Sequence, residues 1–127
     1  MGIRIIVDST ADLTPNVRER VTVVPLTVHF GEQEFVDGVD ITGYQFYEML
    51  ETSSVLPTTS QASPYAFSAA FGQAVADGEE VIAIVVSSKL SGTYQSAIIA
   101  AEDYSGKVHV VDSRNIAIGS AILVEYA

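Results

Sequence analysis

Hydroxyl and carboxylate side chains follow three apolar runs of this sequence, each at the point where the run ends. Because parallel strands end along the same edge of a sheet, we expect these side chains to line one crevice there. Asp, Ser and Thr also form turns and cap helices, so local structure alone can explain any single junction. Three such junctions together favour a binding site. They are Asp8-Ser9-Thr10, Ser87-Ser88 and Asp112-Ser113.

The run before Ser87 gives the clearest strand signal in the chain. Residues 81–86 are all aliphatic, which is typical of a central parallel strand covered on both faces. A helix is predicted directly afterwards, with Ser91 as its N-cap. The N–H groups of a helix's first turn favour an acidic or phosphorylated ligand. The apolar stripe of this helix consists of Tyr94, Ala97, Ile98 and Ala101.

Several kinds of chemistry can be weighed against these motifs. Nucleotide binding has weak support, because the chain has no glycine-rich phosphate loop and only the single Gly92 follows Ser91. A hydrolase would need a base beside its serine, and the only histidines, His29 and His109, are assigned structural or surface roles. No spacing of acids or histidines predicts a metal site. A small-molecule or phosphate-handling enzyme of doubly wound fold that uses Ser88 or Ser91 remains the alternative hypothesis.

The composition limits the class of protein. The 127 residues, of which 48% are hydrophobic, suffice for one domain with a core. The 16 acidic and 6 basic residues give a formal charge of −10, which argues against nucleic acid as a partner, since such binding requires a basic surface. The sequence has no cysteine, no apolar run of transmembrane length and no signal-peptide pattern, so we expect a cytoplasmic protein.

Short β-rich runs alternate with helical patterns along the chain. This order predicts an α/β fold, with a mainly parallel sheet and helices on both faces. Residues 21–35 interrupt the alternation. Pro25 removes a strand's hydrogen-bond donor, and Gly31 can adopt a positive φ, so we expect a small antiparallel hairpin at the edge of the sheet.

Three more helices are predicted from capping residues that precede an apolar pattern. Thr14 opens a short helix that extends to Arg20, Thr42 opens an aromatic-rich helix, and Ser63 opens a helix that stops at Gly78. Residues 52–64 are dense in hydroxyls and are expected to form a linker. Residues 116–127 have near-helical spacing and no stop signal, so we expect 1–127 to be one domain, truncated before a second domain.

Four segments resemble, in the same order, the successive motifs of the DegV family, bacterial fatty-acid-binding proteins that include the FakB type. The segments are residues 7–13, 57–64, 87–97 and 111–113. The Ser-x-Leu-Ser-Gly-Thr pattern of the third segment is the most specific. The resemblance implies two α/β domains with one long-chain fatty acid between them, and this chain is similar to the first domain only.

By this similarity, Thr59 and Ser91 hold the carboxyl group of the fatty acid. The resemblance also implies that a partner fatty acid kinase phosphorylates the bound acid, so that this protein is a carrier rather than an enzyme and needs no cofactor. Other carboxyl contacts come from the second domain of the family, so the missing C-terminal domain would complete the site. Secondary candidates are Ser60, Ser88, Gly92 and Thr93.

Physical chemistry agrees with this expectation. Neutral hydroxyls and helix N–H groups can hold a carboxyl group without the desolvation cost of a buried ion pair. An acyl chain contributes about 0.8 kcal/mol per methylene, so roughly fifteen carbons contribute on the order of 10 kcal/mol, against about 1–3 kcal/mol for each head-group bond. The tail should therefore dominate affinity. Core packing is the first assignment, and a tunnel wall the second, for Phe46, Tyr47, Met49, Phe67 and Phe71.

Overall fold

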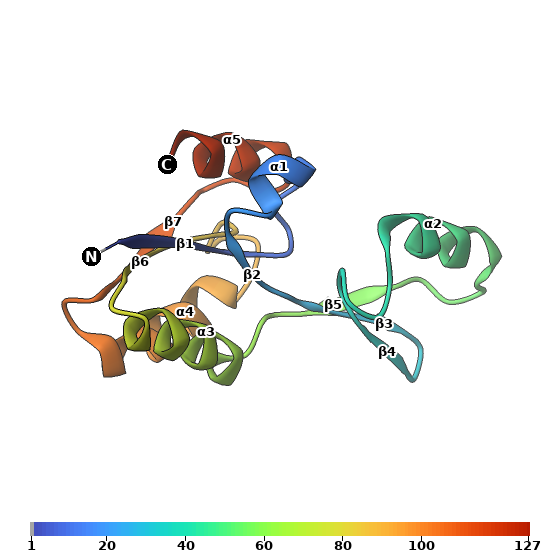
Figure 1. Cartoon of the computed structure of the whole chain (residues 1–127). Helices are drawn as coiled ribbons and strands as arrows, with labels where there is room; N and C mark the ends of the chain where they lie inside the picture. The colour runs from blue at the N-terminus through green and yellow to red at the C-terminus, as the bar shows by residue number, and fades with distance from the viewer. Residues whose placement is uncertain (1) are drawn as a thin grey trace.

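A four-stranded parallel sheet forms the centre of the computed structural model, which describes residues 2–127 (Figure 1). Its strand order is β2-β1-β6-β7, and every neighbouring pair is parallel. The aliphatic run forms β6, which pairs with β1 on one side and β7 on the other, so its predicted central place is confirmed. The strands are β1 (Ile3–Asp8), β2 (Thr22–Val24), β6 (Glu80–Val85) and β7 (Val108–Asp112).

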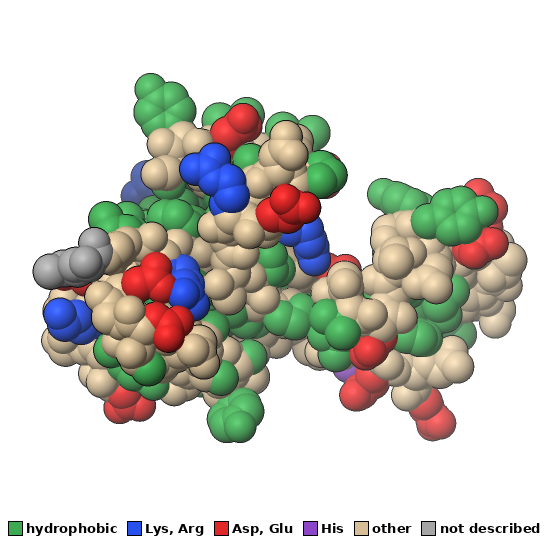
Figure 2. Space-filling view, in the orientation of Figure 1, with side chains coloured by type: hydrophobic (Ala, Val, Ile, Leu, Met, Phe, Trp, Pro, Cys, Tyr) green, Lys and Arg blue, Asp and Glu red, His purple; other side chains and the backbone are tan. Residues whose placement is uncertain are grey.

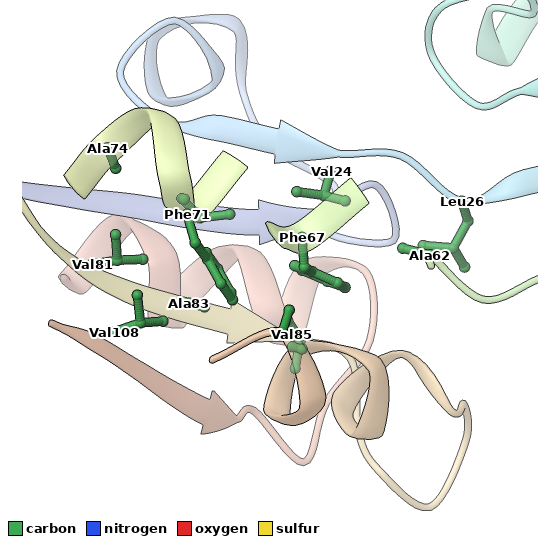
Figure 3. Packing of buried hydrophobic residues seen from close by; sticks show 13 residues of the cluster. Val24, Leu26, Ala62, Phe67, Phe71, Ala74, Val81, Ala83, Val85 and Val108 are labelled. Carbon is green, nitrogen blue, oxygen red and sulfur yellow. The ribbon is translucent and has the colours of Figure 1, made fainter. Parts of the chain in front are cut away.

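Helices cover both faces of this sheet, as predicted (Figure 1). On one face, Phe67 and Phe71 are fully buried beside Ala83 and Val85 of β6 (Figure 3). Both phenylalanines therefore belong to the core, which was their first assignment. Helices α3 (Pro64–Ala76) and α4 (Thr93–Ala101) lie on this face, with η1 (Glu102–Tyr104) following α4, and α1 (Pro15–Arg18) and α5 (Ile118–Tyr126) lie on the other.

A second, antiparallel sheet projects from this body together with one helix, and we call residues 27–60 the lobe (Figure 1). The predicted hairpin is confirmed, with Gly31 at φ 64° in its turn. It belongs to this separate sheet, because a third strand that was expected to be part of a linker pairs with it. The elements are β3 (Thr27–Phe30), β4 (Gln33–Val36), α2 (Gly43–Thr52) and β5 (Thr58–Ser60).

The lobe has a small core of its own and an acidic surface. Phe46 and Met49 of α2 pack against the buried Val28, Phe30 and Ile41, so their assignment to core packing is confirmed. The same assignment is wrong for Tyr47, which is 65% exposed. The lobe contains no Lys or Arg, and red carboxylates without blue cations mark its visible face (Figure 2). Its acids are Glu32, Glu34, Asp37, Asp40, Glu48 and Glu51.

Two connections join the lobe to the body at the carboxyl edge of the parallel sheet. Leu26 and Ala62 are only 6% and 3% exposed, and they lie near each other where the two connections leave the body (Figure 3). The Leu26 N–H donates to Ser9 Oγ at 2.9 Å, which fixes the first connection to the loop after β1. Pro25 lies in the bend between β2 and β3, where it removes no ladder donor.

The helix caps agree with prediction in two cases and differ in two. Thr42 forms a capping box, and Ser63 Oγ accepts from Ala66 N. Thr14 is an N-cap by position without a side-chain cap bond, and its helix ends at Arg18 rather than Arg20. Ser91 is not the N-cap of α4: Gly92 is, because the turn after β6 runs one residue further than predicted.

Candidate binding site

A cleft of about 260 Å³ lies where the lobe meets the carboxyl edge of the parallel sheet. Thr59 of β5 and Ser91, which precedes α4, both line it, although they are 32 positions apart in sequence. Strand ends from the body and the last strand of the lobe thus converge at one place. The lining residues are Thr10, Leu26, Thr59, Gln61, Val86, Leu90, Ser91, Gly92 and Ile116.

Thr59 and Ser91 reach the cleft in different ways. Thr59 is an exposed residue of β5, opposite Val28 in the register of the lobe sheet. Ser91 Oγ accepts from the Thr93 N–H at 3.2 Å and pairs with Thr93 Oγ1 at 2.9 Å. Thr93 is fully buried, so the Ser91 hydroxyl is held by the first turn of α4. Either hydroxyl can be the donor in this pair, and when Thr93 Oγ1 donates, the Ser91 hydroxyl hydrogen is free to donate to a ligand oxygen.

The carboxylate of Asp8 organises the loops around the cleft. One oxygen accepts from the Val86 N–H at 2.6 Å, and the other accepts from the N–H and hydroxyl of Thr10 at 2.8 and 2.5 Å. Asp8 is 2% exposed, so its carboxylate faces the backbone rather than the cleft. The first predicted junction therefore serves to fix Thr10 and Val86, which themselves line the cleft.

Asp112 has a similar role at the end of β7. Its carboxylate accepts from the Ser88 hydroxyl at 2.5 Å, from the Ser88 N–H at 3.2 Å and from the Arg114 N–H at 3.0 Å. The Ser88 hydroxyl first, and then the Arg114 N–H, hold the pKa of Asp112 below its usual value. A carboxylate with a lowered pKa is a poor base, so this pair does not activate Ser88 as a nucleophile.

The secondary candidates divide into two groups. Gly92 lines the cleft, and Thr93 lies buried behind it, where it supports Ser91. Ser60 and Ser88 do not line the cleft. Ser60 Oγ instead lies 2.6 Å from His29 Nε2 on the lobe sheet, in an exposed contact. The bonds made by Ser91 and Ser88 go to Thr93 and Asp112, so neither serine has the adjacent histidine base that the enzyme hypothesis requires.

Several lining residues were not among the sequence candidates. Gln61 stands next to Ser60 in the second motif, and only the geometry shows that its carboxamide reaches α4. Leu26 could have been suggested by the Pro25 bend, which returns the chain to the sheet's edge. Ile116 follows β7 in a loop whose backbone is tied to the loop after β1, because Ala117 N donates to Thr10 O at 3.0 Å.

A larger hollow of about 460 Å³ lies elsewhere, between α1, α5 and the uncovered part of the parallel sheet. Ile3, Ile5 and Val124 contribute apolar walls, and Arg20 and Glu125 contribute charges. It contains none of the residues that the sequence analysis names as binding-site candidates. Among residues 2–127 no group of three or more His, Cys, Asp or Glu is placed to hold a metal ion. None of the helices in that range combines the length and the hydrophobicity needed to cross a membrane.

The family model described as "Uncharacterised protein, DegV family" matches residues 2–127. The chain belongs to the DegV family. A DegV domain-containing protein of Deinococcus radiodurans is 40% identical over 126 residues, which is 98% of this chain and 45% of that protein. One of Clostridium perfringens is 38% identical over 96% of this chain and 45% of its own length. This DegV chain thus spans about half the length of the curated relatives that it matches.

Solved structures of DegV proteins share the fold, and several are described as fatty-acid-binding proteins. A Thermus thermophilus protein described as "Fatty Acid Binding of a DegV family Protein" aligns with a TM-score of 0.90 at 35% identity, over 99% of this chain and 46% of its own. A stearic-acid-binding protein of Eubacterium ventriosum aligns with a TM-score of 0.89 at 35% identity, over 98% of this chain and 45% of its own.

Proposed function

We propose that this DegV chain binds a long-chain fatty acid, with the carboxyl group held by the hydroxyls of Thr59 and Ser91. The observation that carries this proposal is that both side chains line one cleft at the carboxyl edge of the parallel sheet. Ligands of open α/β folds bind at that edge. The fatty-acid-binding descriptions of the structural neighbours from Thermus thermophilus and Eubacterium ventriosum add support.

The proposed head-group site suits a carboxyl group in an acidic protein. With a formal charge of −10, the chain repels a free anion, and the lobe beside the cleft carries no Lys or Arg. Hydroxyl donors bind a carboxyl group without requiring a buried cation. The affinity must therefore come mainly from the acyl tail, at about 0.8 kcal/mol per methylene.

The acyl tail of the ligand needs a larger apolar cavity than this cleft provides. At about 260 Å³ the cleft is below the range of roughly 300–1,000 Å³ that is usual for small-molecule pockets. The relatives are more than twice as long as this chain. We therefore propose that a second, C-terminal domain completes the site, and that the protein acts as a carrier which presents its ligand to a fatty acid kinase in the cytoplasm.

Extraction and titration test this function. Purified protein is extracted with organic solvent and analysed by mass spectrometry, and labelled palmitate is titrated into the 127-residue chain and into a longer form. In the longer form, the second half of the Deinococcus radiodurans relative follows Ala127. We expect a co-purified long-chain fatty acid and tighter palmitate binding by the longer form. Absence of lipid and of palmitate binding in both forms would refute the proposal.

A further inference from the structure

We propose that Gln61 is a positioning residue whose carboxamide packs against Gly92. This contact fixes strand β5, which carries Thr59, relative to the start of α4, which follows Ser91. The ligand-binding consequence of this contact rests on the proposed fatty-acid site. The contact itself does not, and it can be tested without ligand.

The carboxamide bridges two segments that no strand pairing joins. Gln61 Nε2 donates to Ser96 Oγ at 3.0 Å, a bond between residues 35 positions apart. Ser96 lies in α4 and is only 1% exposed, whereas Gln61 directly follows β5 and lines the cleft. The bond therefore connects the end of the lobe to the body.

Gly92 provides the space that this contact needs. A Cβ placed on Gly92 would lie 1.9 Å from Gln61 Oε1 and 2.7 Å from Gln61 Cδ. The φ of Gly92 is −74°, which other residues adopt without strain, so glycine is required here for space and not for backbone conformation. Any side chain at position 92 would push the carboxamide away from Ser96.

The contact matters because each of the two connections to the lobe is tied to the body by side-chain hydrogen bonding near the cleft. The first connection is fixed by the bond from the Leu26 N–H to Ser9 Oγ. The second has the Gln61 bond and the buried Ala62. Without the bond, the exposed Thr59 would be held by its pairing with β3 inside the lobe, and its position relative to Ser91 would be set less firmly.

A double-mutant cycle tests the inference, with Gln61→Ala, Gly92→Ala and the double variant. The readouts are thermal unfolding without lipid and palmitate affinity of the longer form at a temperature where every variant is folded. We expect each single variant to weaken palmitate binding by about 2- to 10-fold, the equivalent of one hydrogen bond. The double variant should bind no more weakly than Gln61→Ala, because both substitutions break the same contact.

Matched controls separate this effect from general ones. Gly43→Ala also places a methyl group near the start of a helix, but no atom lies within 4 Å of its Cβ position. Gln95→Ala removes a carboxamide from the exposed side of α4. Both controls should leave palmitate affinity unchanged. In amide NMR spectra without lipid, Gln61→Ala should shift the signals of both Thr59 and Ser91.

Additive effects in the cycle, or a Gly92→Ala variant that behaves like Gly43→Ala, would overturn the inference. If Gly92→Ala alone fails to fold, the double variant is expected to fold, and its failure would also overturn it. If wild-type protein does not bind palmitate, the proposed function fails. The unfolding temperatures and amide shifts then still decide whether Gln61 and Gly92 act as one unit.

Discussion

The carboxylate of Asp8 accepts a hydrogen bond from the Val86 N–H at 2.6 Å and so joins the ends of the two central strands. Both residues are almost fully buried. Asp8→Ala would leave the Val86 N–H without its acceptor and would release Thr10. We expect a loss of about 1–3 kcal/mol in the free energy of unfolding, measured by urea denaturation.

Asp12→Ala is the matched control for that variant. Asp12 belongs to the same loop, but its side chain is exposed, so Asp12→Ala should change the free energy of unfolding by no more than about 0.5 kcal/mol. Equal losses in Asp8→Ala and Asp12→Ala would show that the buried carboxylate does not fix the strand ends.

Asp112 makes the stability of the chain depend on pH. Its pKa in the folded state is lowered, chiefly by the Ser88 hydroxyl. The ionised carboxylate therefore stabilises the fold above its unfolded-state pKa of about 3.9, and this contribution is lost as the pH falls through the folded-state pKa. Asp112→Asn should lower the unfolding temperature at neutral pH, and the difference from wild type should shrink in acid.

Ser88→Ala removes the donor that lowers this pKa most, so it should show a weaker form of the same pH dependence. Unfolding temperatures across the acidic range provide the measurement for both variants. A cost of Asp112→Asn that is the same at neutral and acidic pH would contradict the assignment.

The fold was predictable from sequence where the pattern is strong and local. The aliphatic run at 81–86 predicts β6, and Ser63-Pro64 predicts the start of α3. In both cases the signal lies in a few consecutive residues, an unbroken apolar run for the strand and a cap followed by proline for the helix. Strand β5 was missed. Its Thr-Thr-Ser sequence has no apolar alternation, and its strand conformation comes from pairing with β3, which is 31 positions away along the chain.

The site was predictable only in part. The strand-end rule located the correct edge of the sheet, and the family resemblance supplied Thr59 and Ser91. Sequence could not show that Asp8 binds the Val86 N–H or that Asp112 binds Ser88, because only the fold brings these partners near. It also could not show that Gln61 occupies the space above Gly92, since these residues are 31 positions apart and only the fold brings them together.

Thr59→Ala and Ser91→Ala should each weaken palmitate binding by about tenfold, which corresponds to one head-group bond of about 1.4 kcal/mol. Thr59 is exposed, so its loss should hardly change stability. Ser91→Ala should also lower stability modestly, because it leaves the buried Thr93 hydroxyl without the Ser91 oxygen. Fluorescence titration and thermal unfolding measure the two effects.

Thr58→Ala serves as the control, because Thr58 is also an exposed threonine of β5 but does not line the cleft. It should bind palmitate as wild type does. If all three variants keep the wild-type affinity, Thr59 and Ser91 do not contact the ligand.

Ala117 adopts a backbone conformation that favours glycine, with φ 55° and ψ −123°. Bonds to the loop after β1 hold it there, since Ala117 N donates to Thr10 O and Ala117 O accepts from Asp12 N. Such strain costs about 1–3 kcal/mol. Ala117→Gly relieves this strain at an entropic cost of about 0.5–1 kcal/mol. We therefore expect the free energy of unfolding, measured by urea denaturation, to rise by about 1 kcal/mol.

Ala121→Gly provides the opposite expectation within the same segment. Ala121 lies inside α5, where glycine costs about 1 kcal/mol relative to alanine. The two alanine-to-glycine changes should therefore move the free energy of unfolding in opposite directions. A destabilisation of similar size in both variants would mean that Ala117 is not strained. The loop that contains the cleft residue Ile116 would then adopt its conformation without backbone strain.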